Sequence, residues 1–161
     1  HLLGTAGEGG AETYFVDPAL ALAGERVAQA AALRAHPVRE RVLSDAGVAV
    51  ETFGFGGPLD LMTRRRVSRF AQDQKVSVAL AWMNRAARHT PKGPWARIGR
   101  LGGYYNLKYY AGFDFLVANT EDIAEWVVGQ GWPAGQVAYI PNFAEAHAGR
   151  GPPAAGHGPA A

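Results

Sequence analysis

Cysteine is absent from the 161-residue sequence, which excludes disulfide bridges, thiolate metal sites and cysteine nucleophiles. The sequence also lacks a run of about 20 apolar residues, the length that a membrane-spanning helix needs, and no signal peptide opens it. No pair of its histidines has the spacing of metal ligands, so no metal site is predicted. The lack of cysteine is compatible with a protein of the reducing cytoplasm.

The composition predicts one folded domain followed by a tail. Hydrophobic residues make up 48% of the chain and charged residues 19%, a balance typical of globular domains. Residues 144–161 differ, because fourteen of these eighteen residues are Ala, Gly or Pro and none is an aliphatic or aromatic residue larger than Ala. Such a segment buries too little surface to offset the entropy of ordering. We therefore predict a folded domain over residues 1–143 and a disordered tail over residues 144–161.

Seven short apolar runs alternate with helical patterns, which favours βα units and a parallel sheet. The run at residues 76–82 is almost continuously hydrophobic, as expected where helices cover both faces of a strand. The predicted fold class is therefore α/β, a Rossmann-like doubly wound parallel sheet of about six or seven strands. The candidate strands are residues 1–3, 27–33, 48–53, 76–82, 96–101, 113–119 and 137–140.

Local signals mark several helix ends. Gly47 stands where a C-terminal cap belongs, and Asn119 and Thr120 can cap the start of a helix. Met62 and Phe70 fall on the apolar stripe of a helix and are expected to join the core. Pro18 interrupts the first helical pattern, either as a kink or as the first residue of a short helix capped by Asp17.

Positive charge is concentrated in one part of the chain. Residues 64–108 contain eleven Lys or Arg residues and one acid, a net charge of +10, so the rest of the chain carries −8. One interpretation is a set of solvated helix faces. The other is a basic surface suited to phosphate groups on a lipid, a sugar or a nucleic acid.

Residues 4–12 form a glycine-rich segment between the first predicted strand and the first predicted helix. A glycine-rich turn at this place lets backbone N–H groups approach a diphosphate. The spacing is not G-x-G-x-x-G, so a dinucleotide fingerprint has weak support. Arg34, at the end of the second strand, would suit a 2′-phosphate and leaves an NADP site open. A flexible turn without a ligand is also compatible with the segment.

Three short motifs form a further pattern: Gly9-Gly10-Ala11-Glu12, residues 117–121 and residues 131–142. Together they resemble motifs of the group-four GT-B glycosyltransferases, and Gly9-Gly10-Ala11-Glu12 is similar to that family's G-G-A-E loop. Residues 117–121, Val-Ala-Asn-Thr-Glu, are similar to its V-A-x-S-E step from strand to helix. Residues 131–142, Gly-Trp-Pro-Ala-Gly-Gln-Val-Ala-Tyr-Ile-Pro-Asn, are similar to its G-V-P-x-x-x-V-x-V-I-P-N-G segment. The motifs follow the family's order, so the chain resembles the N-terminal domain of such an enzyme.

The resemblance implies a retaining, metal-independent transfer of a sugar from a nucleotide-sugar donor, which is a substrate, so no cofactor is implied. Gly9 and Gly10 would bind the donor's diphosphate. The family's C-terminal donor domain, with its E-x7-E pair of glutamates, is missing, so no catalytic residue is assigned and the chain alone is expected to be inactive. Phe143 replaces the glycine that ends the third motif, and residues 100–105 stand where many members have a histidine.

Polar residues near the ends of the predicted strands are candidates for contacting the acceptor. Arg85 and Arg100 carry planar donor forks that suit phosphate or carboxylate, although solvated arginines fit the pattern equally well. Tyr104 would either stack on a sugar or pack in the core. The predicted acceptor-binding residues are Glu12, His36, Asn84, Arg85, Arg100, Gly102, Gly103, Tyr104, Asn119 and Thr120.

These observations lead to one main functional hypothesis and two alternatives. The first is the acceptor domain of a glycosyltransferase of cell-envelope glycan synthesis, such as lipopolysaccharide synthesis. It would use an anionic glycan or lipid-linked acceptor and would be cytoplasmic, peripheral on the inner face of the membrane. The alternatives are an NADP-binding domain and a basic module that binds nucleic acid. Basic and aromatic residues are not interleaved as in nucleic-acid readers, so no nucleic-acid partner is expected.

Overall fold

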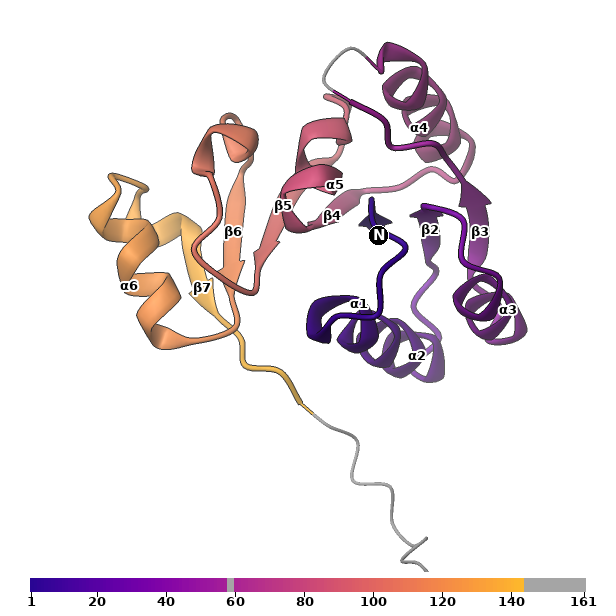
Figure 1. Cartoon of the computed structure of the whole chain (residues 1–161), viewed down its shortest axis with the longest axis horizontal. Coiled ribbons are helices and arrows are strands. Elements are labelled where there is room, and N and C mark those ends of the chain that lie inside the picture. Colours follow the sequence, from indigo (N-terminus) through magenta and orange to yellow (C-terminus); the bar gives the residue numbers. More distant parts are fainter. Residues whose placement is uncertain (58–59, 144–161) are drawn as a thin grey trace, which may run out of the picture.

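The computed structural model describes residues 1–57 and 60–143, so the predicted tail at 144–161 lies outside the described residues. Within them the chain forms a seven-stranded sheet in the order β3-β2-β1-β4-β5-β6-β7 (Figure 1). Every neighbouring pair of strands is parallel. The predicted Rossmann-like α/β class is confirmed. The strands are β1 (Leu2–Leu3), β2 (Ala30–Leu33), β3 (Ala49–Thr52), β4 (Val78–Trp82), β5 (Ala96–Leu101), β6 (Phe115–Ala118) and β7 (Val137–Tyr139).

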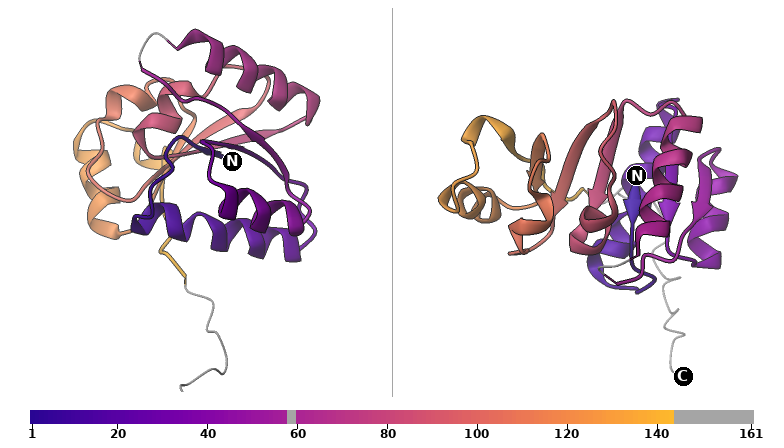
Figure 2. Two further views of the ribbon diagram at one scale, coloured as in Figure 1. Left: turned by 45° about the vertical axis from the view of Figure 1, so that its right-hand side comes forward. Right: turned by 90° about the horizontal axis from the view of Figure 1, so that it is seen from above.

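Helices cover both faces of this sheet (Figure 2). One core cluster joins α1, α2 and α3 to Leu3 and Leu33, and the other joins α4, α5 and α6 to Leu2 and Ala32. Adjacent residues of a strand point to opposite faces of the sheet. A strand that contributes to both clusters therefore needs consecutive apolar residues. The helices are α1 (Gly10–Tyr14), α2 (Val16–Gly24), α3 (Pro37–Asp45), α4 (Leu61–Asp73), α5 (Met83–His89) and α6 (Glu121–Gly129), with the 3₁₀ turns η1 (Leu107–Tyr110) and η2 (Ala134–Gln136).

The predicted helix caps at Gly47 and Thr120 are confirmed. Gly47 follows α3 with a φ of +81°, a conformation that favours glycine. The Thr120 hydroxyl accepts a hydrogen bond from the Ile123 N–H at 3.2 Å and so caps α6. The alternative in which Asp17 caps a helix starting at Pro18 is wrong. The helical stretch instead divides at Phe15, and Pro18 lies in the first turn of α2, where its missing N–H has no acceptor within the helix.

Met62 was expected in the core, and this prediction is wrong. Its side chain is 67% exposed at the start of α4, beside the exposed Leu61. Phe70, on the same helix, is partly buried and packs against the core as predicted. The apolar stripe of α4 therefore does not meet the sheet along its whole length, and its first turn presents apolar side chains to the surroundings.

Gly99 in β5 permits the closest packing between the sheet and a connecting turn. A Cβ atom at this position would lie 2.4 Å from Cδ1 of Tyr110. Tyr110 is completely buried in η1, and this burial raises the pKa of its hydroxyl. The glycine thus fixes how close η1 lies to β5, and with it the position of the neighbouring Lys108 and Tyr109.

Candidate functional site

A cavity of about 220 Å³ lies at the carboxyl ends of the central strands, the edge at which doubly wound sheets bind their ligands. A larger cavity, of about 420 Å³, lies near the starts of β2 and β4 and touches no predicted site residue. We therefore take the smaller cavity as the candidate site. It is lined by Gly10, Ala11, Tyr14, Trp82, Met83, Arg100, Gly102, Asn119 and Asn142, so four of the twelve predicted residues lie in it.

Arg100 is the most constrained residue of this cavity. Its guanidinium lies 5.2 Å from the ring centroid of Tyr14 and 5.3 Å from that of Trp82. Its Nη2 donates hydrogen bonds to Oδ1 of Asn142 at 2.7 Å and to the carbonyl of Ile140 at 3.3 Å. Burial lowers the pKa of Arg100, and nearby Tyr14 opposes this shift. Arg100, which was predicted to contact the acceptor, is thus hydrogen-bonded within the chain and holds the segment that follows β7.

Two polar atoms at the cavity have no hydrogen-bond partner among the described residues. They are Nε1 of Trp82, which can only donate, and Oδ1 of Asn119, which accepts. A buried polar atom without a partner is costly, by about 1–3 kcal/mol, so a polar ligand would be stabilised here. Met83 lines the same cavity with a φ of +67°, a strained conformation for a non-glycine residue and one that is common at functional sites.

Two charged side chains, Arg39 and Glu12, contact the glycine-rich segment and hold it in place. The buried Arg39 donates hydrogen bonds to the carbonyls of Thr5 and Gly7 at 3.4 and 3.0 Å. Burial lowers the pKa of Arg39, and the charges of Glu12 and Glu8 oppose this. A Cβ atom on Gly9 would lie 2.8 Å from Oε2 of Glu12. Glu12 therefore fills the space under the loop and does not line the cavity.

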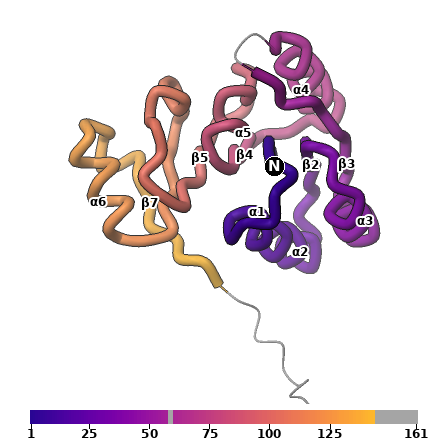
Figure 3. The backbone as a smooth tube through the Cα atoms, viewed as in Figure 1, coloured from indigo at the N-terminus to yellow at the C-terminus, as the bar shows by residue number. Residues whose placement is uncertain are grey.

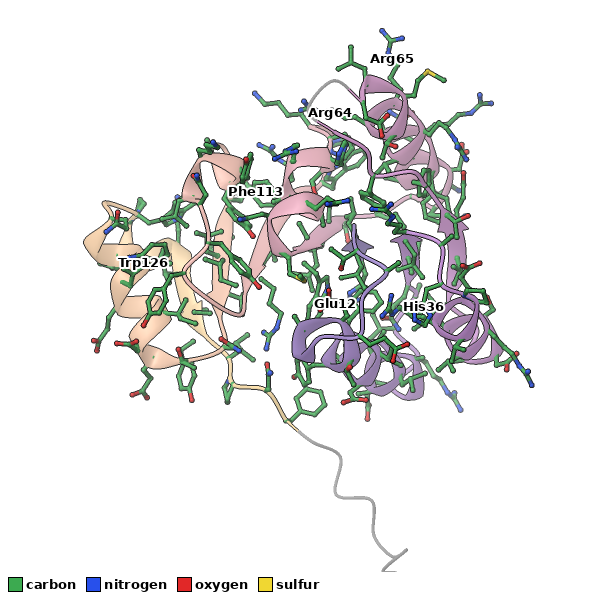
Figure 4. All side chains as sticks on the ribbon, in the orientation of Figure 1. Glu12, His36, Arg64, Arg65, Phe113 and Trp126 are labelled. Atoms are coloured by element: carbon green, nitrogen blue, oxygen red, sulfur yellow. The ribbon has the colours of Figure 1, made fainter. Side chains whose placement is uncertain are left out.

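His36 has partners within the chain for both ring nitrogens. Nδ1 accepts a hydrogen bond from the Arg39 N–H at 3.2 Å and caps α3, while Nε2 lies 3.2 Å from Oε1 of Glu8. Figure 4 shows Glu12 and His36 on the side of the sheet that carries α1, α2 and α3. His36 thus lies beside the glycine-rich segment, outside the cavity.

The remaining predicted residues lie around the cavity without lining it. Asn84 and the exposed Arg85 are in the first turn of α5. The Tyr104 hydroxyl donates a hydrogen bond to Asp122, and its ring packs against Trp126 at 5.3 Å. The others outside the cavity are Gly9, Gly103 and Thr120, and the NADP candidate Arg34 is exposed after β2.

Sequence reasoning assigned no site role to five cavity residues, Ala11, Tyr14, Trp82, Met83 and Asn142. Trp82 was assigned to a strand, and its final position in the run 76–82 was the signal that it reaches the carboxyl edge. Within residues 1–57 and 60–143, no three His, Asp or Glu side chains are grouped so that they could hold a metal ion. In the same residues no helix is both long and apolar enough to cross a membrane.

No family model matches the chain. The chain is similar to part of two lipopolysaccharide core glycosyltransferases. It is 35% identical over 140 residues to the lipopolysaccharide core biosynthesis glycosyltransferase LpsE of Rhizobium meliloti (strain 1021), which covers 84% of this chain. It is 33% identical over 142 residues to LpsD of the same organism, covering 86% of this chain. The chain spans 41% of the length of each relative.

Solved structures of Anabaena HepE share the fold. The structure in complex with UDP-glucose superposes with a TM-score of 0.65 at 15% identity, and the one with UDP and glucose with a TM-score of 0.64 at 16% identity. Each match covers 88% of this chain and 43% of HepE. At this identity the likeness establishes the fold alone.

Proposed function

We propose that this chain is the acceptor-side, N-terminal half of a two-domain GT-B glycosyltransferase. The full protein would transfer a sugar from a nucleotide-sugar donor, with retention and without a metal ion, in cell-envelope glycan synthesis. The observation that carries the proposal is the 35% identity to a lipopolysaccharide core glycosyltransferase over 140 residues. The cavity at the carboxyl edge supports it, because it supplies a place where donor and acceptor would meet.

The cavity residues suggest a division of roles. Gly10 lines the cavity, and a Cβ atom at this position would meet nothing within 4 Å, so its backbone is open to a diphosphate oxygen. We assign Gly9 and Gly10 to the donor diphosphate. Trp82 Nε1 would donate to an acceptor hydroxyl and Asn119 Oδ1 would accept from one, which would satisfy both unpartnered atoms. The nucleotide pocket and the catalytic carboxylates would lie in a donor domain outside this chain.

The exposed side chains of α4 suggest that the protein binds an anionic membrane surface. Leu61 and Met62 are 61% and 67% exposed, and Arg65 and Arg69 are exposed on the same helix. Figure 4 shows Arg65 directed away from the body of the molecule. Exposed apolar side chains beside arginines are the pattern by which a helix lies on an anionic lipid surface. We propose that this turn brings the enzyme to a membrane that presents its acceptor.

Substitution at Gly10 tests the assignment of the loop. In the two-domain protein, Gly10→Val is expected to reduce sugar transfer by about a hundredfold or more, because the side chain would occupy the space of a preorganised backbone contact. Gly24→Ala is the matched control, since a Cβ atom there also meets nothing within 4 Å. Donor consumption is measured with a panel of nucleotide sugars, with thermal unfolding as a check that both variants fold.

The 161-residue chain alone provides the baseline for this assay and is expected to consume no donor above background. Robust turnover by the chain alone would overturn the division into two domains. Full activity of Gly10→Val in the two-domain protein would show that the loop is only a connection.

A further inference from the structure

Another cavity, of about 250 Å³, lies between α4, α5, β5 and η1. It shares no lining residue with the candidate site. Five segments of the chain each contribute one cation to it, and no carboxylate lines it. The cations are Arg64, Arg88, Lys92, Arg97 and Lys108. They are separated by up to 44 positions in the sequence, so the fold, rather than a local charge run, brings them together.

Aromatic rings hold three of these cations without neutralising them. The Arg88 guanidinium lies 4.6 Å from the ring centroid of Tyr109, and Lys108 Nζ lies 5.0 Å from the same ring. The Arg97 guanidinium lies 5.2 Å from the ring centroid of Phe113. Such contacts fix the direction of a cation while its remaining N–H groups stay available. The side chains are therefore preorganised around the cavity.

Nearby hydrogen bonds leave most of the donors unused. Nη2 of Arg88 donates to the Tyr109 hydroxyl at 2.8 Å, and Nη2 of Arg97 donates to the carbonyl of Gly112. Each guanidinium has five N–H donors. Among the described residues, the side-chain ion pairs involve other cations: His36 with Glu8, Arg41 with Asp45, and Arg66 with Glu51. In the described part of the chain, none of the five cations is therefore in a side-chain ion pair, and the nearby Asp114 carboxylate accepts its hydrogen bond from the backbone N–H of Arg97.

We propose that this cavity binds a phosphate group, as a monoester or diester. The planar guanidinium forks of Arg64, Arg88 and Arg97 match phosphate oxygens, and the two lysines add point charges. An anion would relieve the mutual repulsion of the cations. Arg97 and Arg100 lie three residues apart on β5, so their side chains point to opposite faces of the sheet. The phosphate site therefore lies across the sheet from the candidate active site, and it does not depend on the proposed function.

Binding of inorganic phosphate and glycerol 3-phosphate, measured by calorimetry and amide chemical shifts at low salt, tests the proposal. The variant Lys92→Gln/Lys108→Gln removes two exposed cations of the cavity. It is expected to weaken binding by about tenfold or more, from the loss of charged hydrogen bonds. The matched control Arg65→Gln/Arg69→Gln removes the same charge from α4 outside the cavity and is expected to change binding less than about twofold.

Vesicles distinguish the two sources of the phosphate. The α4 face is itself proposed to bind anionic vesicles, so the competition is measured with the Arg65→Gln/Arg69→Gln variant. If saturating glycerol 3-phosphate displaces this variant from phosphatidylglycerol vesicles, the cavity holds a lipid headgroup. If it binds the variant without displacing it from vesicles, the cavity holds a phosphorylated soluble group. Either result supports the site. No saturable phosphate binding, or equal weakening by the two double variants, would overturn it and leave a diffuse basic surface. Tight binding of a short RNA with no phosphate binding would also overturn it.

Discussion

In the structure the guanidinium of Arg100 contacts other residues of the chain, although Arg100 was predicted to contact a ligand. As a candidate acceptor contact it was expected to offer its donor fork to a ligand. In the fold its guanidinium lies between two aromatic rings and binds the chain's own residues after β7. Its side chain therefore contributes to the wall of the cavity and to the position of the segment that closes it.

Replacing Arg100 is expected to reduce stability. Arg100→Gln would remove the charged hydrogen bonds to Asn142 and Ile140, and hydrogen bonds to charged groups contribute about 1.5–3 kcal/mol each. We expect the free energy of unfolding in urea to fall by about 2 kcal/mol. Most of this loss comes from the 2.7 Å bond to Asn142, because the 3.3 Å bond to Ile140 is longer than an ordinary N–H···O hydrogen bond. Arg85→Gln, at an exposed position, is the control and is expected to change it by less than about 0.5 kcal/mol.

A double-mutant cycle with Asn142→Ala separates this clamp from simple loss of packing. If Arg100 acts through Asn142, the double variant is expected to lose clearly less stability than the sum of the two single variants. Strictly additive effects would mean that the 2.7 Å contact has no energetic role.

At the scale of the elements, α4 depends on a carboxylate at its start. Oδ1 of Asp60 accepts from the Thr63 N–H at 2.9 Å, and Oδ2 accepts from the Thr63 hydroxyl at 2.6 Å and the Gly56 N–H at 2.8 Å. These hydrogen bonds, first those from Thr63, lower the pKa of Asp60 from 3.8 to about 2. The cap joins α4 to the segment that follows β3.

The pH dependence of stability tests this cap. Because the pKa of Asp60 is lower in the folded state, its contribution is fully present above pH 3.8 and is lost as the pH falls to about 2. Urea unfolding of Asp60→Asn is expected to give a lower midpoint than the unmodified chain at pH 6, with the difference vanishing near pH 2. Asp73→Asn removes the same charge at the other end of α4 and is the control. A constant difference across this range would contradict the assignment.

The elements were the most predictable part of the molecule. Each of the seven predicted strands contains an observed one. Strands β2 and β4 are uninterrupted apolar runs, as central strands covered on both faces must be, and such runs are visible without knowing their neighbours. Caps such as Gly47 and Thr120 are equally local. Met62 was misplaced because its exposure depends on how far α4 extends beyond the sheet, and that is a property of the assembled layers.

The site was predictable only where position along a strand decides it. Asn119 and Gly102 were found because carboxyl ends of parallel strands meet at one edge. Trp82 has the same position at the end of a strand but was assigned to the strand alone. Tyr14 was missed because an aromatic ring that packs on a guanidinium looks the same in sequence as a ring in the core. Arg39 was missed because it supports the glycine-rich segment from another helix, across 32 positions. Contacts of this kind follow from the topology and leave no local pattern.

At the scale of the whole molecule, the candidate site and the phosphate cavity lie at different parts of the sheet and share no lining residue. Helix α4 carries a third surface, formed by its exposed apolar first turn and the exposed Arg65 and Arg69. Of the eleven cations in residues 64–108, five line the phosphate cavity, while Arg65 and Arg69 lie on the exposed face of α4. These two parts are expected to respond differently to substitution and to salt.

The α4 face is expected to bind anionic membranes. Arg65→Gln/Arg69→Gln should weaken binding to phosphatidylglycerol vesicles, since a cation near such a surface contributes about 1 kcal/mol, and the effect should be largest at low salt. Vesicle co-sedimentation at several salt concentrations measures it, with phosphatidylcholine vesicles as the control. Equal binding to both kinds of vesicle, independent of salt, would identify the face as an ordinary solvated surface.

The path of the chain after β7 links two ends of the fold that are distant in sequence. Figure 3 shows the segment after β7 running back toward α1, where the Phe143 N–H donates to the Tyr14 hydroxyl at 3.2 Å and the two rings pack 5.6 Å apart. Helix α1 also begins at Gly10, in the glycine-rich segment. Helix α1 therefore connects the glycine-rich segment, through Gly10, to the outgoing chain, through Tyr14. We expect a change in the position of Phe143 to be accompanied by a change in the position of this segment.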